Sequence, residues 1–169
     1  GPATIGAWDA NGGGLYTRFL DGRIDDMRIY RGVLTAAEVA ELAVVPEPTQ
    51  LLAHWTFDTD ASDATGVHDG ALRGGASITA QSHVGSGALD LRSANGYVDV
   101  PTAVLNGAAS FTVAMFVSAD ALAAGCCTAL FANDGWAPGK LHINLSAAGV
   151  PEAAINGNPA SAWGTSGMV

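Results

Sequence analysis

The sequence contains few charged residues, few aromatic residues and little cysteine. Charged residues make up 14% of the 169 positions and aromatic residues 7%, and seven Lys and Arg stand against 16 Asp and Glu. The net charge of -9 repels nucleic-acid phosphates and anionic lipid surfaces, so we expect neither as a partner. The longest apolar run, residues 111–117, is followed by Ser118 and Asp120 and is too short to cross a bilayer. We therefore expect no membrane insertion.

Cysteine occurs only at the neighbouring positions Cys126 and Cys127, too few for a zinc site without histidine ligands. The pair is compatible with a disulfide between adjacent residues or with bonds to other chains. Two small, half-buried apolar side chains are the more common case, and we expect them here. Gly1 and Pro2 resemble the remnant of a cleaved affinity tag, so the natural amino terminus and any signal peptide are not visible.

Glycine, by contrast, is abundant, at 22 positions, and apolar and polar residues alternate with a period of two. This alternation predicts β-strands, and the Gly, Asn and Asp clusters between the apolar runs supply the positive φ angles of tight turns. We predict an all-β protein. Its expected strands cover residues 15–20, 23–31, 51–57, 88–91, 97–100, 110–117, 128–132, 140–146 and 152–155.

One short helix is also predicted. Thr35-Ala-Ala-Glu38 is a capping box, in which the Thr35 side chain accepts from the Glu38 N–H and the Glu38 side chain reaches back. Val39 and Leu42 form a short apolar face that is expected to dock on the sheet. The two prolines in residues 46–50 cannot continue a helix, so we interpret that segment as a linker.

Several of these motifs resemble laminin G-like domains of the concanavalin A-like jelly-roll superfamily. Residues 19–39, with the run Arg23-Ile-Asp-Asp-Met-Arg-Ile-Tyr30, are similar to the closing segment of such a domain. Later segments are similar to its opening: Leu51-Leu-Ala-His-Trp-Thr-Phe-Asp58, Val84-Gly-Ser-Gly-Ala-Leu-Asp90, Asn95-Gly-Tyr-Val-Asp-Val-Pro101 and Ser110-Phe-Thr-Val-Ala-Met-Phe-Val117. The resemblance implies a jelly-roll β-sandwich. Family members usually carry Trp where Phe116 stands, and Phe116 is expected to keep an aromatic side chain in the core.

The order of these motifs is reversed, because the closing motif precedes the opening motif. We expect residues 1–2 to be a tag scar, residues 3–45 to be the closing strands and helix, and residues 51–169 to be the opening part. Three arrangements fit: a fragment of a tandem array, a circularly permuted domain, or a domain whose early strands pair with a neighbouring molecule. In each, residues 3–45 and 51–169 are expected to pack as one unit within or between chains. Sheets that lack strands also leave open edges that invite self-association.

The superfamily also contains glucanases, which place two carboxylates on one strand face in a Glu-x-Asp-x-Glu pattern. That pattern is absent here, and of the four Glu, two lie in the expected helix and one in the linker. No Gly-x-Ser-x-Gly nucleophile elbow occurs either. We expect no enzymatic activity.

Asp25 and Asp26 are neighbours in the strand expected around residues 24–30. Alternation places Asp25 on the apolar face of this strand and Asp26 on the same face as Arg28. An ion pair of Asp26 with Arg28 or Arg23 across a surface is the simplest interpretation.

Calcium binding is the second interpretation of these aspartates. Calcium takes about six to eight oxygen ligands, which acidic strand ends beside Gly and Asn turns supply. The resemblance implies a structural calcium ion that joins the opening and closing strands, held by Asp25 or Asp26 and by Asp58. Asp60 belongs to Asp58-Thr-Asp60, which matches the Asp-x-Asp spacing of calcium-binding loops only in part. The alternative is that Asp58 binds no ion and is simply solvated.

Aromatic rings in loops are candidates for stacking on sugars. Trp55 alternates with apolar residues and is expected in the core, whereas Trp136 and Trp163 lie in Gly-rich loops and are the better ligand candidates, with loop packing as the alternative. His142 and Asn144 share the non-core face of one strand, where they either contact a ligand or simply face solvent.

Together these features predict a non-catalytic extracellular or cell-surface module of laminin G-like type for binding or adhesion. Its expected partner is a carbohydrate or an extracellular protein. The alternative is a structural or filament-forming repeat that assembles by strand pairing between chains and binds no ligand.

Overall fold

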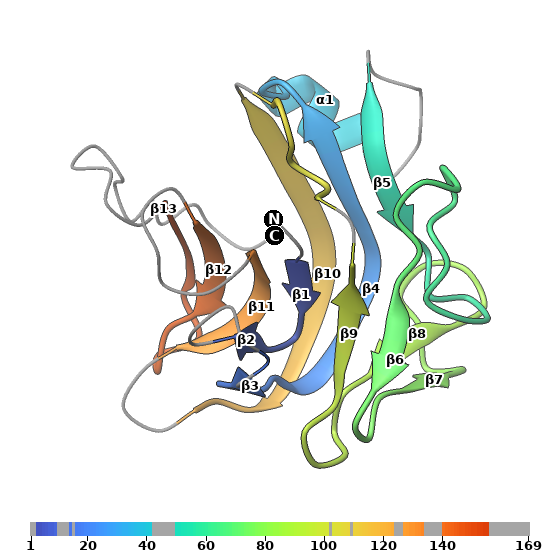
Figure 1. Cartoon of the computed structure of the whole chain (residues 1–169), viewed down its shortest axis with the longest axis vertical. Coiled ribbons are helices and arrows are strands. Elements are labelled where there is room, and N and C mark those ends of the chain that lie inside the picture. Colours follow the sequence, from blue (N-terminus) through green and yellow to red (C-terminus); the bar gives the residue numbers. More distant parts are fainter. Residues whose placement is uncertain are drawn as a thin grey trace.

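The structure is a computed structural model that describes residues 3–9, 14, 16–41, 50–101, 103–108, 110–123, 127–133 and 140–155. Within these residues the chain forms antiparallel β-strands and one short helix, so the all-β prediction is confirmed (Figure 1). The elements are β1 (Ala3–Ile5), β2 (Trp8–Asp9), β3 (Tyr16–Thr17), β4 (Asp21–Arg31), α1 (Ala36–Glu41), β5 (Leu51–Trp55), β6 (Ala71–Arg73), β7 (Ser77–Thr79), β8 (Ala88–Asp90), β9 (Tyr97–Val100), β10 (Phe111–Ala121), β11 (Thr128–Asn133), β12 (Leu141–Leu145) and β13 (Pro151–Ile155).

The strands form two main sheets. The first sheet has the order β13-β12-β11-β1-β9-β6, and the second has the order β10-β4-β8-β7, with β5 also paired to β4. The short strands β2 and β3 form a separate hairpin. All the described strand pairs are antiparallel, which allows tight turns between many of them.

Strands from the two ends of the sequence lie together in both sheets. β1 lies between β9 and β11, and Ala3 is opposite Val100 on one side and Asn133 on the other. β4 pairs with β10 along one side and with β5 and β8 along the other. The described parts of residues 3–45 therefore share their sheets with strands that follow residue 50. Residues 46–49 of the expected linker and residues 1–2, the expected tag remnant, lie outside the described residues.

One hydrophobic core joins the two sheets. Residues of β1, β9 and β11 from the first sheet pack in the same cluster as residues of β4, β5 and β8 from the second. Trp55 and Phe57 are completely buried, as expected for Trp55, and the Trp55 Nε1–H donates to the His68 carbonyl oxygen at 2.9 Å. Burying side chains of this size contributes about 1.5–3 kcal/mol each relative to exposure.

A β-bulge in β4 interrupts the predicted alternation. Asp26 adopts φ 47°, and the pairing with β10 shifts so that Arg28 lies opposite Ala114 while Asp25 lies opposite Phe116. The extra residue moves Asp25 off the face of the buried Met27, so the prediction that these two share a face is wrong.

Phe116 does not lie in the core, which corrects a second expectation. Its side chain is 37% exposed, whereas Val113, Met115 and Val117 pack against the core from the opposite face of β10. The strand period of two requires this result, because a residue between two core-facing positions points away from them.

The predicted capping box is confirmed at α1. The Glu38 N–H donates to Thr35 Oγ1 at 3.2 Å, and the Thr35 N–H donates to Glu38 Oε2 at 2.6 Å. The prediction that Val39 docks on the sheet is wrong, because Val39 is 50% exposed. Leu42, the other residue of the predicted docking face, lies outside the described residues. Among the described residues, no helix has the length and hydropathy needed to span a bilayer.

Candidate functional site

Two aspartates hold a loop that has no strand structure of its own. Asp25 Oδ2, from β4, accepts hydrogen bonds from the backbone N–H groups of His83 at 2.8 Å and Val84 at 2.9 Å. Asp58, which follows β5, accepts through Oδ1 from the Ser86 N–H at 2.5 Å, the Gly87 N–H at 3.1 Å and the Ser86 hydroxyl at 3.2 Å. We call residues 82–87 the clasped loop, because its two halves are held by one carboxylate from β4 and one from the segment after β5.

Glycine allows the clasped loop to approach Asp58 so closely. A Cβ atom at Gly85 would lie 2.3 Å from Asp58 Oδ1, and one at Gly87 would lie 2.4 Å from the Asp58 carbonyl oxygen. Gly85 also has φ +67°, which favours glycine. The backbone hydrogen bond from Ser86 lowers the pKa of Asp58, which keeps this carboxylate ionised and able to accept.

The clasped loop exposes apolar and aromatic side chains. Val84 is 40% exposed, and the His83 ring packs on Phe116 with a centroid distance of 4.2 Å. At the edge of this surface, Arg23 Nη1 donates to Gln81 Oε1 at 2.9 Å. The loop and β10 therefore present a small apolar surface formed by His83, Val84 and Phe116.

Beneath this surface lies a buried acceptor atom. Asp25 is only 4% exposed, and among the described residues its Oδ1 atom has no hydrogen-bond partner, although Oδ2 has two. An unpaired buried carboxylate oxygen is costly, so its presence points to a bound water or cation. Arg23 Nε is a second buried atom without a hydrogen-bond partner among these residues.

Asp26 takes part in a separate cluster. Its Oδ1 atom lies 2.5 Å from His54 Nε2, and its Oδ2 atom lies 2.8 Å from Arg28 Nη2. Burial raises the pKa of Asp26, but the hydrogen bond from His54 and the charge of Arg28 outweigh burial and hold that pKa below its usual value. The predicted ion pair between Asp26 and Arg28 is confirmed, although Asp26 is buried rather than on the surface.

Asp63 organises a second loop and was not singled out from the sequence. It is 4% exposed and accepts from the backbone N–H groups of His54 at 2.8 Å, Thr65 at 3.0 Å and His68 at 2.9 Å, as well as from the Thr65 hydroxyl. Burial raises the pKa of Asp63, but these hydrogen bonds together lower it. The spacing Asp63-x-Thr65-Gly66, a typical turn sequence, is the signal that points to this role.

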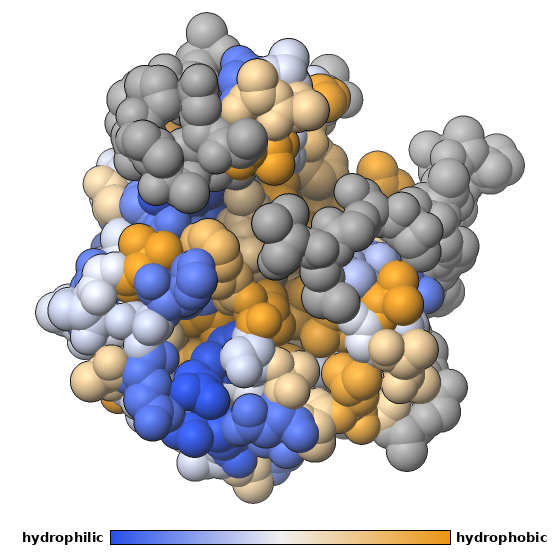
Figure 2. All heavy atoms as spheres, turned by 180° about the vertical axis from the view of Figure 1, so that it is seen from behind, coloured by the Kyte–Doolittle hydropathy of each residue, from blue (hydrophilic) through white to orange (hydrophobic). Residues whose placement is uncertain are grey.

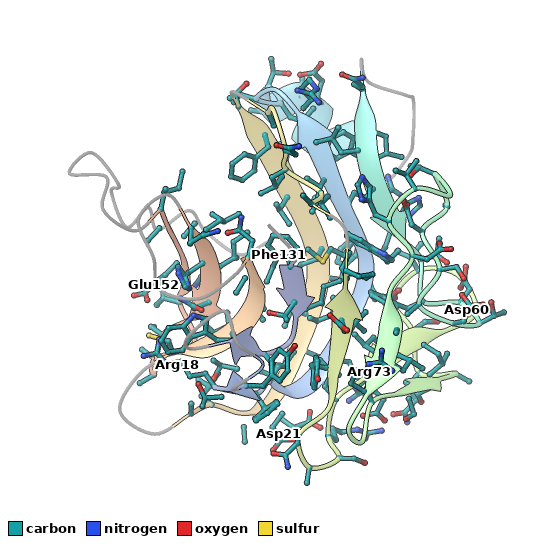
Figure 3. The ribbon with its side chains drawn as sticks, in the orientation of Figure 1. Arg18, Asp21, Asp60, Arg73, Phe131 and Glu152 are labelled. Carbon is teal, nitrogen blue, oxygen red and sulfur yellow. The ribbon has the colours of Figure 1, made fainter. Side chains whose placement is uncertain are left out.

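Two of the four predicted calcium ligands bond to the same loop. Asp25 and Asp58 both hold the clasped loop, whereas Asp26 is paired with His54 and Arg28. Asp60 lies at the outer edge of the molecule (Figure 3), where its Oδ1 atom accepts from the Ser62 N–H at 2.8 Å. Among the described residues, no three His, Cys, Asp or Glu side chains lie close enough to hold a metal ion.

The predicted ligand residues His142 and Asn144 are covered. They are 1% and 3% exposed, so the expectation that this strand face is wet is wrong. The β2–β3 hairpin supplies Trp8, whose ring meets His142 edge-on at 5.8 Å, and the Arg18 guanidinium lies 3.9 Å from the Trp8 ring centroid. Hairpin aromatic residues add a second contact on this face, where Tyr16 stacks on Tyr97 at 4.3 Å.

The remaining sequence-based candidates have different outcomes. Trp136 and Trp163 lie outside the described residues, so their role as ligand contacts stays a prediction. Cys127 is buried and disulfide-bonded, which corrects the expectation of unbonded apolar side chains for this residue.

No family model, curated protein or solved structure matches the chain, so the laminin G-like resemblance rests on the motifs in the sequence.

Proposed function

We propose that the chain is a non-catalytic binding or adhesion module of laminin G-like type with jelly-roll connectivity. It acts outside the cell or at its surface on a carbohydrate or an extracellular protein. The observation that carries this proposal is the clasped loop, which five hydrogen bonds to Asp25 and Asp58 hold in place.

A loop held in this way is suited to binding. Ordering a flexible loop on contact with a partner costs free energy, so a loop ordered in advance binds more tightly for the same contacts. The clasped loop has His83 and Val84 on its exposed side beside Phe116, and a partner that covers this surface would bury apolar area. The rigid sheet below it provides the scaffold on which binding loops are commonly carried.

The chemistry of the carboxylates supports a non-catalytic role. Asp26, Asp58 and Asp63 each accept hydrogen bonds from fixed backbone or cationic donors, and each has a lowered pKa. A general acid in glycoside hydrolysis needs the opposite, a raised pKa and a free path to the substrate. These residues therefore fit structural roles better than proton transfer.

A calcium ion is proposed as part of this module. The buried Asp25 Oδ1 atom, which lacks a partner among the described residues, fits an oxygen-coordinated cation, and Asp58 holds the same loop from the neighbouring strand segment. Asp25 and Asp58, with carbonyl oxygens nearby, would hold the ion. Its role would be to neutralise the two carboxylates and to stiffen the clasped loop.

The binding proposal is tested with a glycan array and a panel of extracellular matrix proteins. We expect the parent to bind at least one of these ligands and His83→Ala and Phe116→Ala to weaken that binding. Val67→Ser is the matched control, because Val67 is 62% exposed on a different loop. Equal binding by all four proteins would place the site elsewhere, and no binding to either panel would contradict the proposal.

A further inference from the structure

The long strand β10 ends the second sheet. Among the described strands, β10 pairs only with β4, although its 11 residues make it as long as β4. Folded proteins usually protect such an edge with Lys, Pro, a charged inward-facing residue or a bulge. Residues 111–119 contain none of the first three, and the bulge on β10 falls only between Ala119 and Ala121.

The free hydrogen-bonding groups of this edge follow from the pairing with β4. The Gly32 N–H donates to the Ser110 carbonyl oxygen at 2.8 Å, so Ser110 directs its polar groups toward β4. Backbone groups of an antiparallel strand alternate in direction, so those of Val113, Met115 and Val117 point to the open side. The edge therefore offers a regular series of donors and acceptors that no described strand pairs.

The same alternate residues carry the apolar face of β10. Phe111, Val113, Met115 and Val117 are partly buried and pack against the core. Figure 2 shows the surface of the molecule from behind, where hydrophobic and hydrophilic residues both reach the surface. A strand added beside β10 would continue both the ladder and the apolar layer.

We propose that β10 pairs with β10 of a second copy of this chain, antiparallel across a twofold axis at Met115. This register is centred on the regular run of residues 111–119. It places Met115 opposite Met115 of the second copy, Val113 opposite Val117 and Phe111 opposite Ala119. The backbone groups of these residues point to the open side, so the N–H and C=O groups of the two strands can hydrogen-bond to each other. Apolar side chains of one strand then contact apolar side chains of the other.

The charge distribution favours a second copy as the occupant. Each chain has a net charge of -9, so two copies repel wherever charged surfaces meet. Residues 111–119 carry no charge, and in this register Asp120 lies opposite Ser110 rather than opposite another acidic residue. β10 is therefore its own complement, and this inference is independent of the ligand-binding function proposed above.

Light scattering after size-exclusion chromatography, over a range of concentrations, tests the inference. We expect the parent to reach twice the 17.0 kDa chain mass at high concentration. Met115→Lys places two like charges directly opposite at the axis and should raise the dimer dissociation constant about tenfold or more. It does so while reducing the net negative charge, so a general charge effect predicts the opposite change. Ser118→Lys, on the other face of β10, adds the same charge opposite Thr112 and should leave the dimer intact.

Charge complementation tests the register. Met115→Lys and Met115→Glu are each expected to be monomeric, and an equimolar mixture should form a heterodimer because opposite charges then meet at the axis. Thermal melting at low concentration checks that both variants fold. A monomeric parent, or an assembly whose mass Met115→Lys leaves unchanged, would overturn the proposal. If both variants fail to fold, the proposal is judged on Ala119→Pro, which removes a backbone N–H from the open side of β10 at an exposed position opposite Phe111 of the second copy. This variant should weaken the parent dimer, and an undiminished dimer would overturn the proposal.

Discussion

Replacing Asp63 by Ala removes an acceptor on which a whole turn depends. The carboxylate is 4% exposed and lies 2.8 Å from the His54 N–H within β5 and 2.9 Å from the His68 N–H. After Asp63→Ala both groups lose this acceptor, as do the Thr65 N–H and the Thr65 hydroxyl. His68 also accepts from Trp55 Nε1, so the perturbation extends to the largest core side chain.

The expected loss of stability follows from these contacts. A buried donor without a partner costs about 1–3 kcal/mol, and the two N–H groups together predict a loss of about 3 kcal/mol. In a domain of this size, 1 kcal/mol shifts the melting temperature by about 2–4 °C, so we expect Asp63→Ala to lower it by about 6–12 °C. Calorimetry or circular dichroism at pH 7 measures the shift.

Asp60→Ala is the matched control for this prediction. Asp60 lies three positions away, is exposed and accepts one backbone hydrogen bond, so its replacement should change stability by no more than about 0.5 kcal/mol. Hydrogen exchange provides a local measurement, because the amides of His54 and His68 should lose protection in Asp63→Ala alone. If the two variants melt at the same temperature, the central role assigned to Asp63 is refuted.

Three further predictions concern the neighbouring aspartates. If Asp25 and Asp58 hold calcium, then calcium at about a hundred times its dissociation constant adds about 2.7 kcal/mol to the free energy of unfolding. The melting temperature should then be about 5–10 °C higher in calcium than in chelator. Asp25→Asn should abolish this rise, and identical melting of the parent in both buffers would exclude the site. Gly87→Ala forces the loop away from the Asp58 carbonyl oxygen and should cost about 1–3 kcal/mol and weaken ligand binding, so an unchanged melting temperature would contradict the close packing of the loop against Asp58. Asp26→Asn leaves His54 without its anionic partner and should cost about 3 kcal/mol at pH 7. Because the folded pKa of Asp26 lies below the unfolded value, its contribution is complete above the unfolded pKa and is lost as pH falls through the folded pKa, so the melting curves of parent and variant should converge below about pH 4.

Local patterns in the sequence were enough to predict most of the longer strands. β9 (Tyr97–Val100) has the predicted bounds, β11 is longer than predicted by one residue at its end, and β12 is shorter than predicted by one residue at each end. Turn residues bound some of these strands locally, with Asn95 and Gly96 before β9 and Asn133 at the end of β11, so their signal is contained in the segment itself. The capping box at Thr35 is local in the same sense.

Other features depend on contacts that no local pattern records. The strand predicted at residues 15–20 is reduced to Tyr16–Thr17, because Arg18 turns to φ 55° and places its guanidinium over Trp8. The predicted strand at residues 51–57 ends at Trp55, since Phe57 also has positive φ. Short strands such as β1 have too few residues for alternation to be visible, and their existence depends on the neighbours that pair with them.

The candidate site shows the same division. Asp25 and Asp58 were singled out together, but their common target, the clasped loop, becomes visible only when the fold brings β4, the end of β5 and residues 82–87 side by side. The burial of His142 was not predictable, because the residue that covers it, Trp8, is far away in sequence. The bulge at Asp26 was equally hidden, since an inserted residue leaves the sequence of an alternating strand almost unchanged.

The position of β1 between β9 and β11 has a consequence for how the protein folds during synthesis. Ala3 is synthesised 130 residues before its partner Asn133. At about 5–20 residues per second, the central strand of the first sheet waits on the order of ten seconds for a neighbour. Pairing between such distant segments is slow to nucleate, because the chain must close a long loop before any contact compensates for the lost entropy. We therefore expect slow refolding after dilution from denaturant, and a nascent chain that depends on chaperones until β11 has been made.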